Sequence, residues 1–485
     1  MGRRAAILLL LAVGVVPAFG QNVFPSITSQ DRIVVVAPHP DDEVLGAGGL
    51  IQQACTAGAE VHVIYLTNGD HNQIAFKLYK LSLHLNPLQY LFFGNLRERE
   101  AMAATSILGL SHEQLTFLGF PDYGTMPIWR DYWREPVPFR SDATHSNAVP
   151  YKQAFAFGQP YTPENAVSDV VELFRRWRPT RVFVTHPADT NPDHRAAANF
   201  VRLATLEVGA EQPAPRIDYY LVHFGRWPAP YHYHPETELK PPRQLLDDGD
   251  WFSIPLTPEQ TERKYRAIIK NRTEMTTREY YLISFARANE IFSTINLLPV
   301  PVAPADAVID WKNAVRTKAI GVSAADSVYH PDTERLFNEE FAAMELEETA
   351  YVRQKNDLIV RVTLRNRLGR RANVHLFLYA YRQGEDFAAL PKIQINVTPL
   401  GSVHVFDGSQ RLKENDVSVI GVGTHLIVRL PMRLLGNERP DYLFAATRSN
   451  LGEVAADDTA WHLFSLSNDT ESGHTIHDKD AGNGE

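Results

Sequence analysis

Two short clusters of imidazole and carboxylate side chains could hold a metal ion. The first contains His39, Asp41 and Asp42, and the second covers residues 186–194 and ends at His194. His39 and Asp42 are three residues apart across a tight turn, so an imidazole nitrogen and a carboxylate oxygen can converge on one ion. His194 can complete three ligands. Two histidines and one carboxylate, with a fourth position left to water, form a catalytic zinc arrangement.

Asp41 stays outside this ligand set. A bound ion lowers the pKa of its water toward about 7, and a free carboxylate beside it can take the water's proton. A simpler alternative is that these acidic residues only cap helices, because aspartate is a favoured N-cap. Two clusters of this composition, each placed between a strand and a helix, favour the metal site over the cap.

The predicted elements alternate between strands and helices from residue 31 to residue 293. Apolar, β-branched runs predict strands, and apolar residues at helical spacing predict helices. The strands fall at 33–37, 61–66 and 181–185, and the helices at 44–57, 97–108 and 165–177. This order predicts an α/β fold, Rossmann-like, with a doubly wound and mostly parallel sheet. Each cluster follows a strand, so both clusters would meet at the carboxyl edge of the sheet, where such folds bind ligands.

The pattern changes after this first domain. It predicts a Pro-rich linker over 294–330, a smaller antiparallel β-sandwich over 331–467 and a flexible tail over 468–485. The sandwich strands are expected at 357–365, 374–381, 393–397, 425–430 and 442–446. Their aromatic residues either form the core or bind a polysaccharide. Within the first domain, an aperiodic excursion over 123–161 is either a lid or an insertion without a catalytic part.

The first 20 residues have the features of a signal peptide. Arg3 and Arg4 precede an apolar run over 5–17, and Ala-Phe-Gly at 18–20 is a small-x-small cleavage site. The run is short for a membrane span, which needs about 20 residues. The protein is therefore expected to be exported, to the periplasm or outside the cell, and to start near Gln21.

Composition excludes several classes of protein. The 485 residues carry a formal net charge of -9 with no basic stripe, which argues against a nucleic-acid partner. No later segment is apolar enough to cross a bilayer, so no integral membrane segment is expected in the mature chain. Cys55 is the single cysteine, which excludes an internal disulfide.

The two clusters also carry a specific resemblance. The sequences Pro-His-Pro-Asp-Asp-Glu at 38–43 and Asn-Pro-Asp-His-Arg-Ala at 191–196 resemble the motifs of the PIG-L/LmbE-like deacetylases. Thr-Asn-Gly at 67–69, Phe-Pro-Asp at 120–122 and Ala-Arg-Ala-Asn-Glu at 286–290 agree with it. The resemblance covers about 31–293. It implies a zinc enzyme that removes acetyl groups from molecules containing N-acetylglucosamine, so an acetylated amino sugar is the expected substrate.

The family assignment implies roles for individual residues. His39, Asp42 and His194 would be the zinc ligands and Asp41 the general base, as the chemistry of the residues also suggests. Two further positions, Arg97 and Asp122, match residues that contact the sugar. The alternatives are a surface ion pair of Arg97 with Glu100 or its neighbours, and a simple turn role for Asp122.

Asn191 departs from the family pattern, because several members have histidine at this position. An asparagine can donate a hydrogen bond to an oxyanion but has no titratable proton. The proton for the leaving amine would then come from Asp41 or from a nearby imidazole, His186 or His223. His223 alternates with apolar residues on a predicted strand, so it is either a substrate-binding residue or a satisfied histidine at the edge of the sheet.

Two competing functions remain open from the sequence. Two histidines and a carboxylate also form the iron site of non-haem oxygenases, so iron is the alternative metal. The free carboxylate of Asp41 argues against that chemistry, which has no need of it. The second alternative is a non-catalytic, secreted glycan-binding protein in which the sandwich is the working part.

Overall fold

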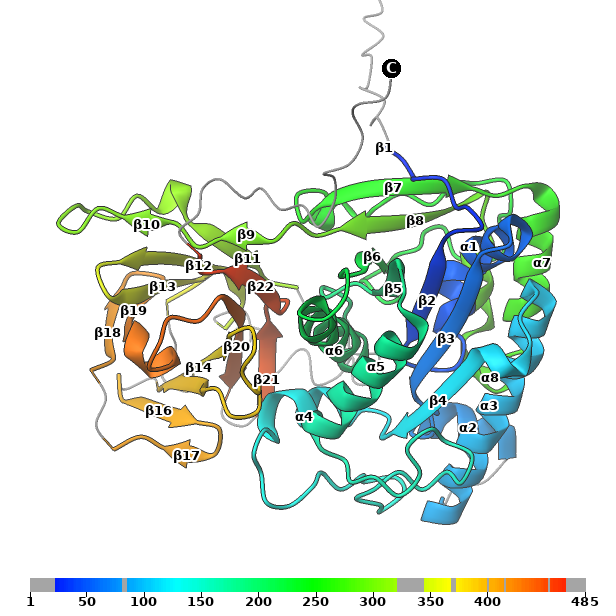
Figure 1. Cartoon of the computed structure of the whole chain (residues 1–485), viewed down its shortest axis with the longest axis horizontal. Coiled ribbons are helices and arrows are strands. Elements are labelled where there is room, and N and C mark those ends of the chain that lie inside the picture. Colours follow the sequence, from blue (N-terminus) through cyan, green and yellow to red (C-terminus); the bar gives the residue numbers. More distant parts are fainter. Residues whose placement is uncertain are drawn as a thin grey trace, which may run out of the picture.

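The computed structural model describes residues 22–80, 85–320, 344–367, 372–398, 401–413, 416–451 and 454–467. The predicted signal peptide (1–20) and tail (468–485) lie outside the described residues. The described chain forms an α/β lobe followed by a β-rich lobe, and the two lobes pack side by side (Figure 1).

The α/β lobe is built on an eight-stranded sheet within the described residues, in the order β1-β7-β8-β6-β5-β2-β3-β4. The strands are β1 (Asn22–Val23), β2 (Arg32–Ala37), β3 (Glu60–Thr67), β4 (Leu115–Phe120), β5 (Arg181–Thr185), β6 (Arg216–Tyr220), β7 (Asp250–Pro255) and β8 (Asn289–Thr294). Strands β2 to β6 are parallel. The pair β7 and β8 is antiparallel and extends one side of the sheet.

The order in which the chain adds strands to the sheet reverses between β2 and β5. From β2 it moves outward to β3 and β4, then returns to β5 and β6 on the other side. Doubly wound sheets bind ligands in the crevice at this switch point, beyond the carboxyl ends of the strands. Both metal-ligand clusters follow these two central strands. The predicted fold class is confirmed, and the predicted strands correspond to β2, β3 and β5.

Helices cover both faces of the sheet. They are α1 (Asp42–Ala57), α2 (Gln73–Lys80), α3 (Pro87–Leu108), α4 (Thr125–Asp131), α5 (Pro163–Trp177), α6 (Pro192–Gly209), α7 (Pro258–Ile268) and α8 (Arg272–Leu282). Alternate residues of β2 divide between the two faces, as a pleated strand requires. Ile33 and Val35 pack with α1, α3 and α7, whereas Val34 and Val36 pack with α5 and α6.

The β-rich lobe is a sandwich of two mostly antiparallel sheets, as far as the structure describes it. One sheet contains β10 (Val302–Ala303), β11 (Val315–Lys318), β12 (Leu346–Gln354), β13 (Asp357–Leu364), β18 (Ser418–Val422) and β19 (His425–Pro431). The other contains β9 (Leu298–Pro299), β14 (Ala372–Tyr381), β15 (Lys392–Val397), β16 (Val403–Asp407), β17 (Gln410–Arg411), β20 (Tyr442–Leu451), β21 (Val454–Asp458) and β22 (His462–Ser465). Buried aliphatic residues of both sheets form the core between them.

The segment predicted as a linker contributes strands to this sandwich. β9 pairs with β22, and both β10 and β11 pair with β12. The prolines of 294–310 interrupt the alternating pattern of a strand, although proline is tolerated in short edge strands. Residues 321–330, which complete the predicted linker, lie outside the described residues.

The two lobes share a buried aromatic interface. Trp129 of α4 lies between Phe200 of α6 (ring centroids 5.5 Å apart) and two sandwich residues, Phe444 (5.2 Å) and Trp461 (5.9 Å). The hydroxyl group of Tyr379 donates a hydrogen bond to a carbonyl group of α4. These sandwich aromatics are therefore buried between the lobes, so they form core and offer no open polysaccharide surface.

The excursion over 123–161 is packed rather than open. Tyr151 and Tyr161 are buried, and the hydroxyl group of Tyr151 donates a hydrogen bond of 2.5 Å to Asp70. A backbone hydrogen bond from the Phe155 N–H to the Phe117 carbonyl (2.9 Å) ties the segment to β4, and the Tyr161 hydroxyl donates to the Gly119 carbonyl (3.2 Å). Such anchoring differs from a hinged lid. Among the described residues, no helix has the length and apolar character required to cross a membrane.

Candidate metal centre and active site

The turn between β2 and α1 holds the first cluster in a strained conformation. Asp41 has φ 134° and ψ -30°, a region that non-glycine residues rarely occupy. It stands at the N-cap of α1, yet its side chain makes no capping hydrogen bond. The carboxylate of Glu43 accepts the Asp41 N–H instead, at 3.0 Å. The Asp41 carboxylate thus caps no N–H group of the helix, and capping does not describe its role.

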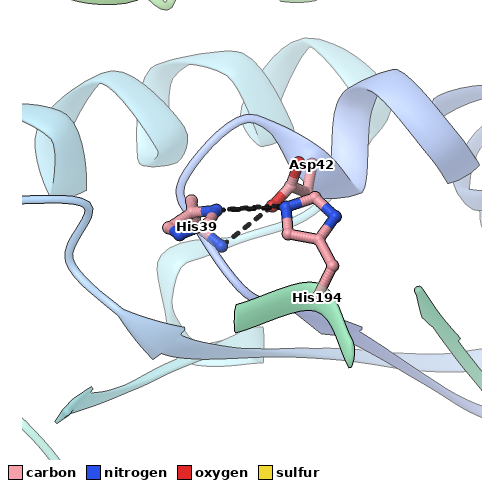
Figure 2. A group of neighbouring side chains, drawn as sticks. All are labelled: His39, Asp42 and His194. Carbon is pink, nitrogen blue, oxygen red and sulfur yellow. Dashed lines mark hydrogen bonds and ion pairs between the residues drawn. The ribbon is translucent and has the colours of Figure 1, made fainter. Parts of the chain in front are cut away.

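His39, Asp42 and His194 bring three ligand atoms together. His39 Nδ1 lies 3.2 Å from Asp42 Oδ2 and 3.2 Å from His194 Nε2, and His194 Nε2 lies 3.1 Å from Asp42 Oδ2 (Figure 2). Ligands bound to a tetrahedral ion at about 2.0–2.2 Å are about 3.3–3.6 Å apart. A small outward shift of the three atoms would therefore fit a divalent ion. All three side chains are buried, as a preformed site requires.

The electrostatics of these residues favour a cation. Burial lowers the pKa of His194, but the carboxylates of Asp189 and Asp42 outweigh burial and raise it to about 9. The pKa of His39 is likewise raised well above its ordinary value, against the effect of burial, chiefly by Asp122. The surrounding carboxylates stabilise positive charge at the two imidazoles, and a metal ion would supply that charge.

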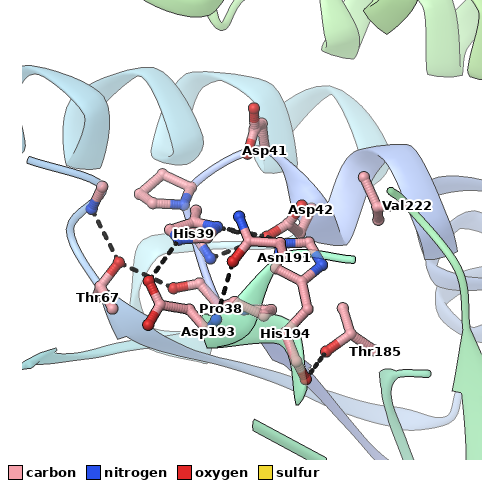
Figure 3. A network of polar contacts seen from close by, with 12 residues as sticks. Pro38, His39, Asp41, Asp42, Thr67, Thr185, Asn191, Asp193, His194 and Val222 are labelled. Atoms are coloured by element: carbon pink, nitrogen blue, oxygen red, sulfur yellow. Dashed lines mark hydrogen bonds and ion pairs between the residues drawn. The ribbon is translucent and has the colours of Figure 1, made fainter. Parts of the chain in front are cut away.

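Two further carboxylates fix the orientation of His39. Its Nε2 atom lies 3.2 Å from Asp122 Oδ1. The same atom lies 3.3 Å from Asp193 Oδ2 (Figure 3). Asp193 in turn accepts hydrogen bonds from the Tyr123 N–H (2.6 Å) and the Thr125 hydroxyl (2.5 Å) at the start of α4. Carboxylates in this position orient a ligating imidazole and fix its tautomer. Asp122 thus contacts His39 and also lines the pocket.

Asp189 has the same role for His194. Its Oδ2 atom lies 3.1 Å from His194 Nδ1 and also accepts the N–H groups of Val222 (3.1 Å) and His223 (2.8 Å). Its other oxygen accepts the Asn191 N–H at 2.9 Å. Asp189 is completely buried and is part of the loop that carries the second cluster. No role was predicted for Asp189 or Asp193, although both belong to the second cluster.

Arg97 is only 4% exposed and holds the Asp41 turn. Its guanidinium donates to the Pro40 carbonyl (2.8 Å) and to the Asp41 carboxylate (3.3 Å), and it also lies 3.2 Å from Glu274 Oε1. This differs from the surface ion pair with Glu100, because Glu100 instead accepts hydrogen bonds from Thr273. Arg97 lines the pocket, but its donors are occupied by the protein.

The environment of Asp41 suits a proton acceptor. Burial raises the pKa of its carboxyl group well above the ordinary value, Arg97 opposes the rise, and the neighbouring carboxylates of Asp42 and Glu274 add to it. The pKa of Asp42 is lowered well below its ordinary value, because His194 and His39 outweigh the effect of burial. The pKa values of these two adjacent carboxyl groups are thus shifted in opposite directions. Such a difference distinguishes a group that exchanges protons, here Asp41, from one that stays charged, here Asp42.

Asn191 is the N-cap of α6. Its side-chain oxygen accepts the Asp193 N–H at 2.8 Å, which leaves the amide nitrogen for another partner (Figure 3). The residue also lines the pocket that contains His39 and Asp42. The geometry therefore leaves an amide N–H donor available beside the metal ligands.

The two histidines considered as proton donors to the leaving amine, His186 and His223, have different surroundings. His186 is buried against Trp251 (ring centroids 5.7 Å apart) and is absent from the pocket lining, so it has no access to a substrate there. His223 lines the pocket. Contrary to the predicted strand position, it lies three residues beyond β6, in a loop at the carboxyl edge. Burial lowers its pKa to about 3.

The hydrogen bonds of His223 define its tautomer. The hydroxyl group of Tyr281 donates to the Val222 carbonyl at 2.5 Å, so its oxygen accepts the proton on His223 Nδ1, 3.2 Å away. The neutral ring therefore carries its unprotonated nitrogen at Nε2.

The pocket has a volume of about 470 Å³, counted with its open mouth. Some of the residues that line it were not predicted from the sequence. They are Leu45, Asn72, Tyr123, Glu274, Arg278, Tyr281 and Leu282. Four of them belong to α8, which reaches the site only through the fold. No motif in the sequence marks that helix.

Comparisons with known proteins identify the first lobe. Residues 34–205 match the family described as PIG-L, GlcNAc-PI de-N-acetylase. A 1D-myo-inositol 2-acetamido-2-deoxy-alpha-D-glucopyranoside deacetylase of Corynebacterium urealyticum is 25% identical over 310 residues, which cover 58% of this chain and 86% of that protein. The deacetylase of the same name from Rhodococcus opacus is 30% identical over 190 residues, or 38% of this chain, and the chain spans about half of its length (56%).

A solved structure, the N,N'-diacetylchitobiose deacetylase of Pyrococcus horikoshii, is 16% identical with a TM-score of 0.34, and covers 54% of this chain and 82% of its own. The family match includes both metal-ligand clusters and ends within α6. Residues 34–205 therefore form a PIG-L family domain.

Proposed function

We propose that this protein is an exported, zinc-dependent hydrolase that removes N-acetyl groups from a conjugate containing N-acetylglucosamine. The observation that carries the proposal is that two adjacent carboxylates occupy different positions. Asp42 faces the two imidazoles, whereas Asp41 is held apart by Arg97 and by its own strained backbone. Hydrolysis of an amide by an activated water needs both groups.

His39, Asp42 and His194 would hold the ion. When bound, a divalent ion lowers the pKa of a coordinated water and polarises the acetyl carbonyl. Asp41 accepts a proton from the attacking water and returns a proton to the amine nitrogen as the C–N bond breaks, which releases acetate and a free amino sugar. The Asn191 amide N–H donates a hydrogen bond to the oxygen that gains negative charge.

The relatives named as deacetylases support the reaction class, and the donor set supports zinc. Two imidazoles and one carboxylate would also suit iron. The carboxylate of Asp41, outside the ligand set, favours hydrolysis over oxygenase chemistry. The sequence of residues 1–20 supports export, and intact-mass analysis of protein recovered outside the cytoplasm, starting near Gln21, would test it.

Acetate release from a panel of N-acetylated sugars, with and without added zinc, tests the proposed reaction. We expect release that depends on the metal and is lost in Asp41→Asn. Asp169→Asn, which removes a buried carboxylate of α5 away from the pocket, is the matched control. Acetate release at the same rate from wild type and Asp41→Asn would overturn the proposal.

A further inference from the structure

The charged residues that line the pocket have partners, with one exception. Asp42 and Asp122 contact His39, and Asp41 and Glu274 contact Arg97. Arg278 lines the same pocket, and among the described residues it forms no ion pair or hydrogen bond. Its five N–H donors therefore face solvent or a ligand.

Arg278 lies at the mouth of the pocket rather than at its base. The side chain is exposed, whereas the metal ligands beneath it are buried. Helix α8 departs from helical geometry at this residue (φ -132°, ψ 25°), one turn before Tyr281. Arg278 lines the same pocket as His223 and Tyr281.

The neighbours of Arg278 are suited to a polar ligand. Tyr123, which also lines the pocket, is 49% exposed. A guanidinium has a planar fork that matches phosphate and carboxylate oxygens, and such charge-assisted bonds are stronger than neutral ones. A substrate held by its acetamido group at the metal would place its remaining part at this mouth.

We propose that Arg278 is a specificity-determining residue that binds an anionic substituent, a phosphate or a carboxylate, on the acetylated substrate. The inference rests on the proposed deacetylase function, since it concerns the same pocket. It narrows the substrate class from any N-acetylglucosamine conjugate to one that carries a negative charge outside the reacting acetamido group.

Matched substrate pairs test the assignment. One pair is N-acetylglucosamine and its 6-phosphate, and the other is 4-carbamoylphenyl and 4-carboxyphenyl N-acetylglucosaminide, which differ in charge at nearly constant shape. Wild type should have a kcat/KM for the anionic member about 5- to 50-fold above that for the neutral one. The two pairs distinguish a phosphate on the sugar from a carboxylate on the aglycone.

The variants separate a specific contact from a general effect of charge. Arg278→Gln should reduce the preference to about 1 and leave the neutral substrates within about two-fold, whereas Arg278→Lys should retain part of it. Arg272→Gln, which removes another exposed arginine from the same helix but not from the pocket, is the control and should keep the preference. Added salt should weaken the preference in wild type.

Calorimetric binding of both substrate pairs to zinc-loaded wild type and Arg278→Gln distinguishes this inference from the proposed function. Equal affinity of wild type for the anionic and neutral members of both pairs would overturn the role of Arg278, whether or not acetate is released. A preference for the anionic member of either pair that disappears in Arg278→Gln would support the role, even if no substrate is hydrolysed. In that last case the deacetylase proposal alone would fail.

Discussion

Replacing Asp189 by asparagine would test whether this buried carboxylate tunes the metal site through His194. The substitution preserves shape but removes the charge that lies 3.1 Å from His194 Nδ1. Partners of this kind are worth about 10- to 100-fold in metal affinity, or about 1.4–2.8 kcal/mol. An asparagine oxygen at the Oδ2 position could still accept the His194 and backbone protons. Its amide nitrogen would then oppose the Asn191 N–H, which now donates to Oδ1 at 2.9 Å.

We therefore expect a loss in the upper half of that range, because a buried unsatisfied N–H adds about 1–3 kcal/mol. The zinc dissociation constant would be measured by competition with a chelating indicator, and circular dichroism would verify the fold. Asp169→Asn, which removes a buried carboxylate away from the pocket, should leave zinc affinity unchanged. Zinc affinity of Asp189→Asn within two-fold of wild type would refute the reasoning that Asp189 tunes the ligand.

Four further predictions follow from the geometry. Asp41→Asn should retain zinc but lose about 10²- to 10⁴-fold in kcat, whereas Asp42→Asn should lose zinc. Metal content and rate are measured on the same preparations, and the reverse pattern would exchange the roles of the two carboxylates. Asn191→Ala should lower kcat about 10- to 1,000-fold with a modest change in KM, and near-normal kcat would exclude the oxyanion contact. Trp129→Ala should cost about 3–5 kcal/mol of unfolding free energy in urea titration, and a loss under about 1 kcal/mol would contradict its central place in the interface. Burial raises the pKa of Asp169 from 3.8 to about 7, so its contribution to stability is complete below pH 4 and is lost as pH rises through 7. Asp169→Asn should therefore raise Tm relative to wild type at pH 8 but not at pH 4, and an equal Tm difference at both values would count against this.

The parts of the fold predicted from sequence are those where one physical signal dominates. Residues 33–37 of strand β2 are continuously apolar because helices cover both faces of the strand, and this pattern is visible without a structure. The strands of the sandwich core were likewise predicted from the alternation of apolar and polar residues. In contrast, β9 and β10 are two-residue edge strands, and so short a segment has no period to detect.

The meeting of the candidate metal ligands could also be predicted from sequence, because the turns after β2 and β5 must meet at the switch point. The contacts that Arg97 and Asp122 make in the structure could not. Arg97 lies on a helix with alternating charges, and the sequence alone cannot show that the fold buries this side chain against Asp41. Glu274 and Arg278 belong to a helix with no motif, and only tertiary packing brings α8 to the pocket.

The aromatic interface between the lobes has a consequence for how the protein melts. Trp129 packs on the sandwich, and its helix begins at Thr125, which holds Asp193 and through it His39. A single apolar cluster contains Val36 of the central strand together with Phe444 of the sandwich. The lobes should therefore unfold in one cooperative calorimetric transition. The proposed zinc ion would bind only the native first lobe, so added zinc should raise the melting temperature of the sandwich by the same amount.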